Sequence, residues 1–137
     1  MGIPFPIMRY NNQVPNGLGI IPFSVCNAVK SDLIVLCMYY EGYKSKYFDE
    51  ISQQGLYRFG TPIQFFNIAN ASITPDFSSD VAKIKYIDLN SRHVMDGIHD
   101  MDIPEDAHLF NAIDDESIKS TYKAIYNNLV NNVHYVK

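Results

Sequence analysis

The sequence predicts an α+β fold, with a small antiparallel or mixed sheet, a long C-terminal helix and an extended N-terminal arm. Two strand-like runs follow each other early in the chain, mixed elements come next, and a stripe with helical spacing closes the sequence. This order is typical of α+β folds rather than of regularly alternating α/β folds. With 137 residues, 47% of them hydrophobic, the chain can build one core but is too short for two ordinary domains.

Residues 1–19 have the composition of an arm, and we assign the single domain to residues 20–137. Pro4, Pro6 and Pro15 each remove a backbone donor and fix φ, which disfavours a regular core element. The arm nevertheless carries side chains that a free tail has little reason to expose, namely Ile3, Phe5, Ile7, Met8 and Tyr10. Two placements remain open: packing on its own domain, or packing on a neighbouring subunit.

The middle of the chain favours strands. Alternation of apolar with polar or small residues over 21–25 predicts a half-buried strand, and the apolar run 33–40 predicts a central strand covered on both faces. Residues 27–32 between them are long enough for a hairpin loop. Residues 63–68 form another candidate strand, although the Thr-Pro pair before them equally suits the start of a short helix. Residues 83–87 alternate clearly and predict a strand with one wet face.

Helices are expected around this sheet. Ser45 can cap a helix over 46–54, with Gly55 at its C-terminal end, and Tyr47, Phe48 and Ile51 facing inward. A shorter helix is predicted over 105–113, with Pro104 in its first turn. The last helix is indicated by an apolar stripe of about four turns, with acidic residues at its start. That stripe comprises Ile118, Tyr122, Ile125, Leu129 and Val133.

Charge and cysteine content restrict the environment. A formal net charge of −4 disfavours general nucleic-acid binding, and we expect no membrane partner, since no apolar run approaches the ~20 residues of a membrane span. Cys37 lies in an apolar run and is expected to pack as a small hydrophobe. A Cys26–Cys37 disulfide stays open, although a secreted domain of this size usually carries more cysteines. We see no targeting segment and expect a protein that is cytoplasmic at synthesis.

Residues 92–108 form the richest polar stretch, with three histidines and five acidic residues. Three interpretations are open: a solvated loop with helix caps, a zinc, iron or manganese site, or acid/base catalysis. A metal site would place His93, His99, Asp100 and His108 around the ion. The His99–Asp100 pair resembles the central dyad of HD-type phosphohydrolases over two residues, but the helices which that family needs would hardly fit beside the predicted strands.

A tyrosine cluster lies between a predicted strand and a predicted helix. Tyr39, Tyr40, Tyr43 and Tyr47 cluster there with Lys44 and Lys46. Such a cluster can form a half-buried sheet edge, anchor a protein interface, or stack the bases of a single-stranded nucleic acid. The net negative charge disfavours nucleic acid. We therefore assign partner binding to six residues: Ile3, Phe5, Ile7, Tyr39, Tyr40 and Tyr43.

These observations favour a non-enzymatic structural or adaptor subunit of a large assembly, and a virus or bacteriophage particle is the instance we expect. Its partners would be copies of itself or neighbouring protein subunits, and no cofactor, catalytic residue or metal ligand is assigned. One alternative is a small cytosolic inhibitor or immunity-type binding protein. A second alternative is a metal-dependent hydrolase that uses the histidines and acids of residues 93–108.

Overall fold

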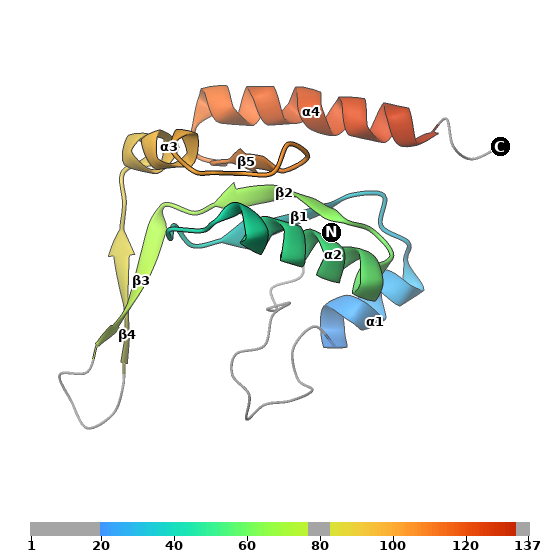
Figure 1. Cartoon of the computed structure of the whole chain (residues 1–137), viewed down its shortest axis with the longest axis horizontal. Helices are drawn as coiled ribbons and strands as arrows, with labels where there is room; N and C mark the ends of the chain where they lie inside the picture. The colour runs from blue at the N-terminus through green and yellow to red at the C-terminus, as the bar shows by residue number, and fades with distance from the viewer. Residues whose placement is uncertain (1–19, 77–82, 134–137) are drawn as a thin grey trace.

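The computed structural model describes residues 20–76 and 83–133, arranged as a helix layer, a small sheet and a second helix layer with a hairpin at one end (Figure 1). The elements in chain order are α1 (Ile20–Ala28), β1 (Ile34–Met38), α2 (Ser45–Phe59), β2 (Ile63–Ile68), β3 (Ala71–Asp76), β4 (Lys83–Asp88), α3 (Ser91–His99), β5 (His108–Phe110) and α4 (Asp115–Val133). This confirms the predicted α+β class and the long C-terminal helix.

The sheet of the body has three parallel strands in the order β1-β2-β5, so β2 is central and β1 forms an edge. Partners in register lie on the same face, and one face therefore carries Leu36, Phe66 and Leu109 side by side. An irregularity between Ile34 and Val35 shifts the register of β1 against β2. The strands β3 and β4 form a separate antiparallel hairpin.

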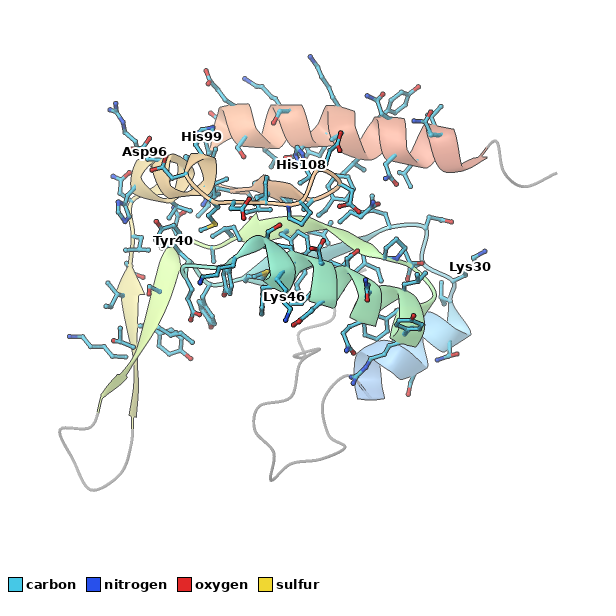
Figure 2. The ribbon with its side chains drawn as sticks, in the orientation of Figure 1. Lys30, Tyr40, Lys46, Asp96, His99 and His108 are labelled. Atoms are coloured by element: carbon cyan, nitrogen blue, oxygen red, sulfur yellow. The ribbon has the colours of Figure 1, made fainter. Side chains whose placement is uncertain are left out.

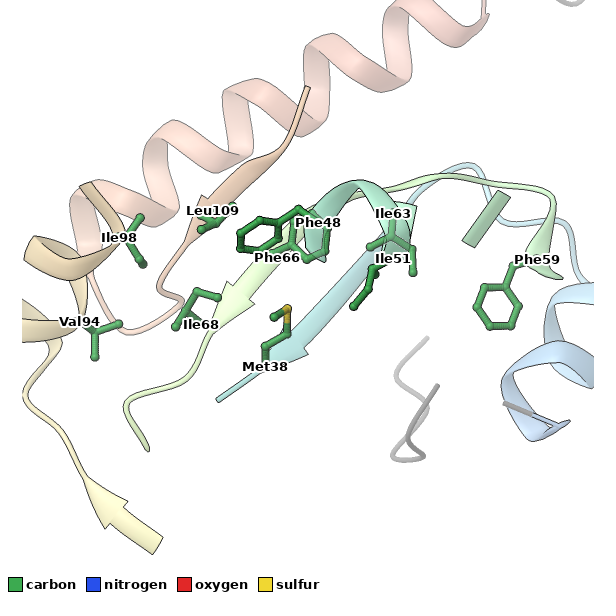
Figure 3. Close-up of a cluster of buried hydrophobic side chains, with 10 residues drawn as sticks. All are labelled: Met38, Phe48, Ile51, Phe59, Ile63, Phe66, Ile68, Val94, Ile98 and Leu109. Atoms are coloured by element: carbon green, nitrogen blue, oxygen red, sulfur yellow. The ribbon is translucent and has the colours of Figure 1, made fainter. Parts of the chain in front are cut away.

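Helix α2 covers the first face of this sheet and completes the core. Phe48 and Ile51 are buried against Phe66 and Ile63, and the rings of Phe48 and Phe66 meet edge to face at 5.0 Å (Figure 3). Close approach requires Gly55, because a Cβ at that position would lie 2.6 Å from Cγ1 of Ile63. The helix and the sheet thus meet with no room for a side chain at this point.

Helix α4 lies along the other face, next to β5 (Figure 1). Phe65 and Phe110 are buried on that side, with only 4% and 6% of their surface exposed. Towards β1 the cover ends, since Val35 is 40% exposed. The second face is therefore covered over β2 and β5 but open over the edge strand.

Several local predictions are wrong at the start of the domain. Residues 20–28 form helix α1 rather than a strand, because Pro22 falls in the first turn, where a helix needs no backbone donor. Residues 27–32 consequently join a helix to a strand instead of closing a hairpin. The run 33–40 contains strand β1, but at an edge rather than in the centre. Cys37 is accordingly exposed, and the described chain has both cysteines as free thiols.

The predicted bounds of α2 are also wrong at both ends. Ser45 is the first helical residue, and Lys44 at the cap position makes no side-chain capping bond. The helix continues through Gly55 and ends at Gly60, whose φ of 75° is left-handed and whose N–H donates to the Leu56 carbonyl. Phe48 and Ile51 face inward as predicted.

The second half of the chain differs from prediction at three places. Residues 105–113 contain strand β5, not a helix, because pairing with β2 buries Leu109 and Phe110 on opposite faces. The polar stretch is a loop only after His99, since its first half forms α3. On α4, Tyr122 is 64% exposed, and Thr121 takes the buried position instead. The strands over 63–68 and 83–87 are confirmed, but the second does not have a single wet face, because the adjacent residues Tyr86 and Ile87 are both exposed.

Candidate interaction surface

The β3–β4 hairpin stands away from the layers of the body (Figure 1). Its base is fixed by two backbone hydrogen bonds: the Tyr40 N–H donates to the Ala71 carbonyl at 2.8 Å, and the Leu89 N–H donates to the Asn70 carbonyl at 2.9 Å. Beyond this base, the two strands pair mainly with each other. As far as the placed residues show, the hairpin is thus a two-stranded ribbon anchored at one end.

Large side chains are exposed along this ribbon. Tyr86 is 61% exposed, Ile87 is 39% exposed, and the ring of Tyr39 lies 5.9 Å from that of Tyr86 and is 39% exposed itself. Interaction with Tyr86, through its charge and a side-chain hydrogen bond, raises the pKa of Tyr39. We call Tyr39, Tyr86 and Ile87 the hairpin patch.

The register of the hairpin shows how these residues are distributed. Tyr86 pairs with Ile73, whereas Ile87 pairs with Ser72. Because successive residues point to opposite faces, Tyr86 and Ile87 lie on different faces of the ribbon. The hairpin patch therefore offers apolar surface to molecules approaching from either side.

Residues of the tyrosine cluster divide between surface and core. Tyr40 is partly buried and lies 5.5 Å from the ring of His93, and Tyr43 stacks on Tyr47 at 4.7 Å. Burial, followed by the nearby charge of Glu41, raises the pKa of Tyr43 and leaves it neutral. Among the predicted partner-binding tyrosines only Tyr39 is exposed. The other three residues predicted to bind a partner lie outside the described residues, namely Ile3, Phe5 and Ile7.

The histidines of the polar stretch are not gathered around one point. His93 and His99 lie on α3, whereas His108 lies on β5 beneath α4 (Figure 2). Asp100 is the C-cap of α3. Within residues 20–76 and 83–133, no three His, Cys, Asp or Glu side chains are grouped so that they could hold a metal ion.

His108 instead joins strand β5 to helix α4. Its Nε2 lies 3.0 Å from Oγ1 of Thr121. The Thr121 hydroxyl donates to the Ser117 carbonyl at 2.8 Å, so it accepts the hydrogen bond from His108. The imidazole also contacts the rings of Phe65 and Phe110, with centroid distances of 5.5 and 6.3 Å. Burial lowers the pKa of His108, which favours the neutral ring.

Asn111 connects the end of β5 to the base of the hairpin. The side chain is 1% exposed, and its Nδ2 donates to the Ile68 carbonyl at 2.9 Å and to Oδ1 of Asn70. Its Oδ1 accepts from the N–H of Ile113 at 2.9 Å, just before α4. One amide thus links β2, the root of the hairpin and the entry to α4.

Sequence reasoning missed the exposed side chains on the hairpin and on α4. The alternation over 83–87 gave the strand but not which of its residues stay uncovered, because that depends on what packs against the hairpin. On α4, exposed Tyr122 and Tyr126 are spaced by four, and Val130 continues the row. That spacing was present in the sequence and could have been recognised as a second stripe.

Among the residues with a described placement, no helix is both long and apolar enough to cross a membrane. Comparison with family models, with curated protein sequences and with solved structures finds no match for this chain.

Proposed function

We propose that this protein is a non-enzymatic structural or adaptor subunit that builds an assembly through contacts between copies of itself. A component of a virus or bacteriophage particle is the instance we favour, from the predicted arm and the composition. The observation that supports self-association best is the hairpin patch, in which Tyr86 and Ile87 are exposed on a ribbon anchored at one end and Tyr39, just after β1, is exposed beside them.

An isolated two-stranded hairpin is at best marginally stable in water, and a further strand or another packed element is needed to hold it. Within the described chain, the β3–β4 ribbon is held at its base by the bonds of Tyr40 and Leu89. A neighbouring molecule that covers the hairpin patch would supply the missing packing. The ribbon therefore has the form expected of an element that is completed on association.

The free energy that burial of the hairpin patch can contribute indicates that the patch acts together with other parts of the surface. In a two-fold contact through the face that carries Tyr86, with Tyr39 beside it, each side chain counts twice, and the exposed fractions of these two residues imply roughly 3–6 kcal/mol from burial. Association costs about 4–15 kcal/mol in lost translational and rotational freedom. The apolar side chains Ile3, Phe5 and Ile7 of the predicted arm would contribute roughly 1.5–3 kcal/mol each on full burial.

Two substitutions of exposed tyrosines test the contribution of the hairpin. Tyr86→Lys places a charge in the hairpin patch, whereas Tyr57→Lys makes the same change on α2, where Tyr57 is 84% exposed. Because both side chains are exposed, both variants should fold. By light scattering, we expect the wild type and Tyr57→Lys to have molar masses that are multiples of 15.6 kDa. Tyr86→Lys should associate more weakly, so that it dissociates at a protein concentration ten-fold higher than the wild type does.

Deletion of residues 2–10 tests the arm in the same assay. The proposal predicts a large loss of association with little change in the melting temperature of the remaining domain. Equal losses of association and of thermal stability would place the arm in its own core and contradict this part of the proposal. A stable 15.6 kDa monomer whose arm resists proteolysis would instead favour the inhibitor or immunity-type alternative.

A further inference from the structure

Among residues 20–76 and 83–133, nothing gives the outer edge of strand β1 the usual protection against pairing. Its sequence from Ile34 to Met38 contains no charged residue and no proline, and Val35 and Cys37 are exposed on its open face. No described strand lies beside its outer side, because the sheet order ends at β1. Natural edge strands are normally protected by lysines, prolines or a covering element. The edge of β1 is thus chemically suited to accept another strand.

The sequence of residues 3–7 has the complementary pattern. Ile3, Phe5 and Ile7 alternate with Pro4 and Pro6. In an extended strand, the N–H and C=O groups of alternate residues point to the same side. The N–H and C=O groups of residues 3, 5 and 7 are therefore all present on one side of the strand. Pro4 and Pro6 have no N–H, and both of these missing donors fall on the other side. Such a strand can pair along one edge only, and its proline side then ends the sheet.

The alternation of residues 3–7 also places the apolar side chains together. Ile3, Phe5 and Ile7 would project to one face of an added strand, since side chains alternate with a period of two. Placed beside β1 in the orientation that turns this row to the open face, Ile3, Phe5 and Ile7 would continue the face that already carries Val35 and Cys37. The residues that can make the hydrogen bonds are therefore also the residues that can cover the exposed face.

We propose that residues 3–7 of one copy add as a strand to the outer edge of β1 in a neighbouring copy. The inference rests on the proposed function, because it assumes association between copies. The twelve residues 8–19 separate this strand from α1 and span up to about 40 Å when extended. A linker of that length allows the strand to extend beyond its own domain.

Disulfide trapping with Cys37 tests the proposal residue by residue. In a Cys26→Ser background, single cysteines are placed at positions 3, 5 and 7, and matched controls at positions 4 and 6. Mild oxidation should give covalent dimers or larger chains on a non-reducing gel for the odd position that the register places opposite Cys37, at least five-fold more than for either even position. The background protein, with Cys37 alone, should stay uncrosslinked, and Cys37→Ser should abolish every crosslink.

A variant with exchanged proline positions provides a second readout. The combination I3P/P4I/F5P/P6F keeps the composition but moves the missing donors to the pairing side. We expect its association to weaken at least ten-fold, while the melting temperature of the dissociated domain stays unchanged. Amide hydrogen exchange should show loss of protection at alternate residues of β1 in the full-length variant relative to the wild type.

The outcomes separate this inference from the proposed function. Equal crosslinking at odd and even positions, or crosslinks only within one chain, would overturn the added strand between copies. If association between copies also survived the proline exchange, the proposed function would stand without the added strand. If the wild-type protein were monomeric at every concentration, the proposed function and the inference would both be wrong.

Discussion

Replacing Asn111 by alanine should destabilise the fold strongly, because this buried amide holds three parts of the chain together. The substitution removes two donated hydrogen bonds, to the Ile68 carbonyl and to Asn70, and one accepted from the Ile113 N–H. It leaves the Ile68 carbonyl and the Ile113 N–H without this partner. A buried polar group that loses its partner costs about 1–3 kcal/mol, so we expect a total loss of roughly 2–4 kcal/mol.

Urea denaturation followed by circular dichroism measures this loss. With an m value of about 2 kcal/mol per M, the expected change lowers the midpoint by roughly 1–2 M. Asn127→Ala, on the exposed side of α4, is the matched control and should change stability by less than about 0.5 kcal/mol. An Asn111→Ala midpoint within 0.2 M of the wild type would refute the role assigned to this amide.

Three further predictions concern the core. Gly55→Ala should destabilise by about 1–3 kcal/mol in urea despite the better helix propensity of alanine, because its Cβ would meet Ile63; a more stable variant would contradict this contact. Phe66→Ala should cost about 3–5 kcal/mol, since the side chain is fully buried, and a loss below 1 kcal/mol would be incompatible with that burial. Burial lowers the pKa of His108 in the folded state. As the pH falls, the imidazole of His108 therefore becomes protonated in the unfolded chain at a higher pH than in the folded protein. Wild-type stability should therefore decline relative to His108→Gln from about pH 6.5 downward, and parallel pH profiles of the two proteins would exclude this linkage.

Periodicity predicted those elements whose burial follows directly from the local sequence. Residues 63–68 are apolar enough to be recognised as a strand, and β2 is indeed the central strand. The prediction of a helix over residues 105–113 was wrong, because a strand buried on both faces has the same apolar content as a short helix. Whether residues 33–40 form a central or an edge strand depends on partners distant in sequence. That information is absent from any local pattern.

The candidate site was predictable only in part for the same reason. Tyr39 was identified from its aromatic neighbourhood, and the structure places it on the surface beside Tyr86. Tyr40 and Tyr43 have the same local composition but pack against the core. Exposure of Tyr86 follows from the way the hairpin leaves the body, which the alternation within β4 does not encode.

The most direct test of the account is the molar mass of the full chain as a function of protein concentration, measured by light scattering. Reversible association predicts a weight-average mass that rises with concentration towards a fixed multiple of 15.6 kDa. A mass that stays at 15.6 kDa up to several hundred micromolar would contradict the central claim that copies of this chain complete one another.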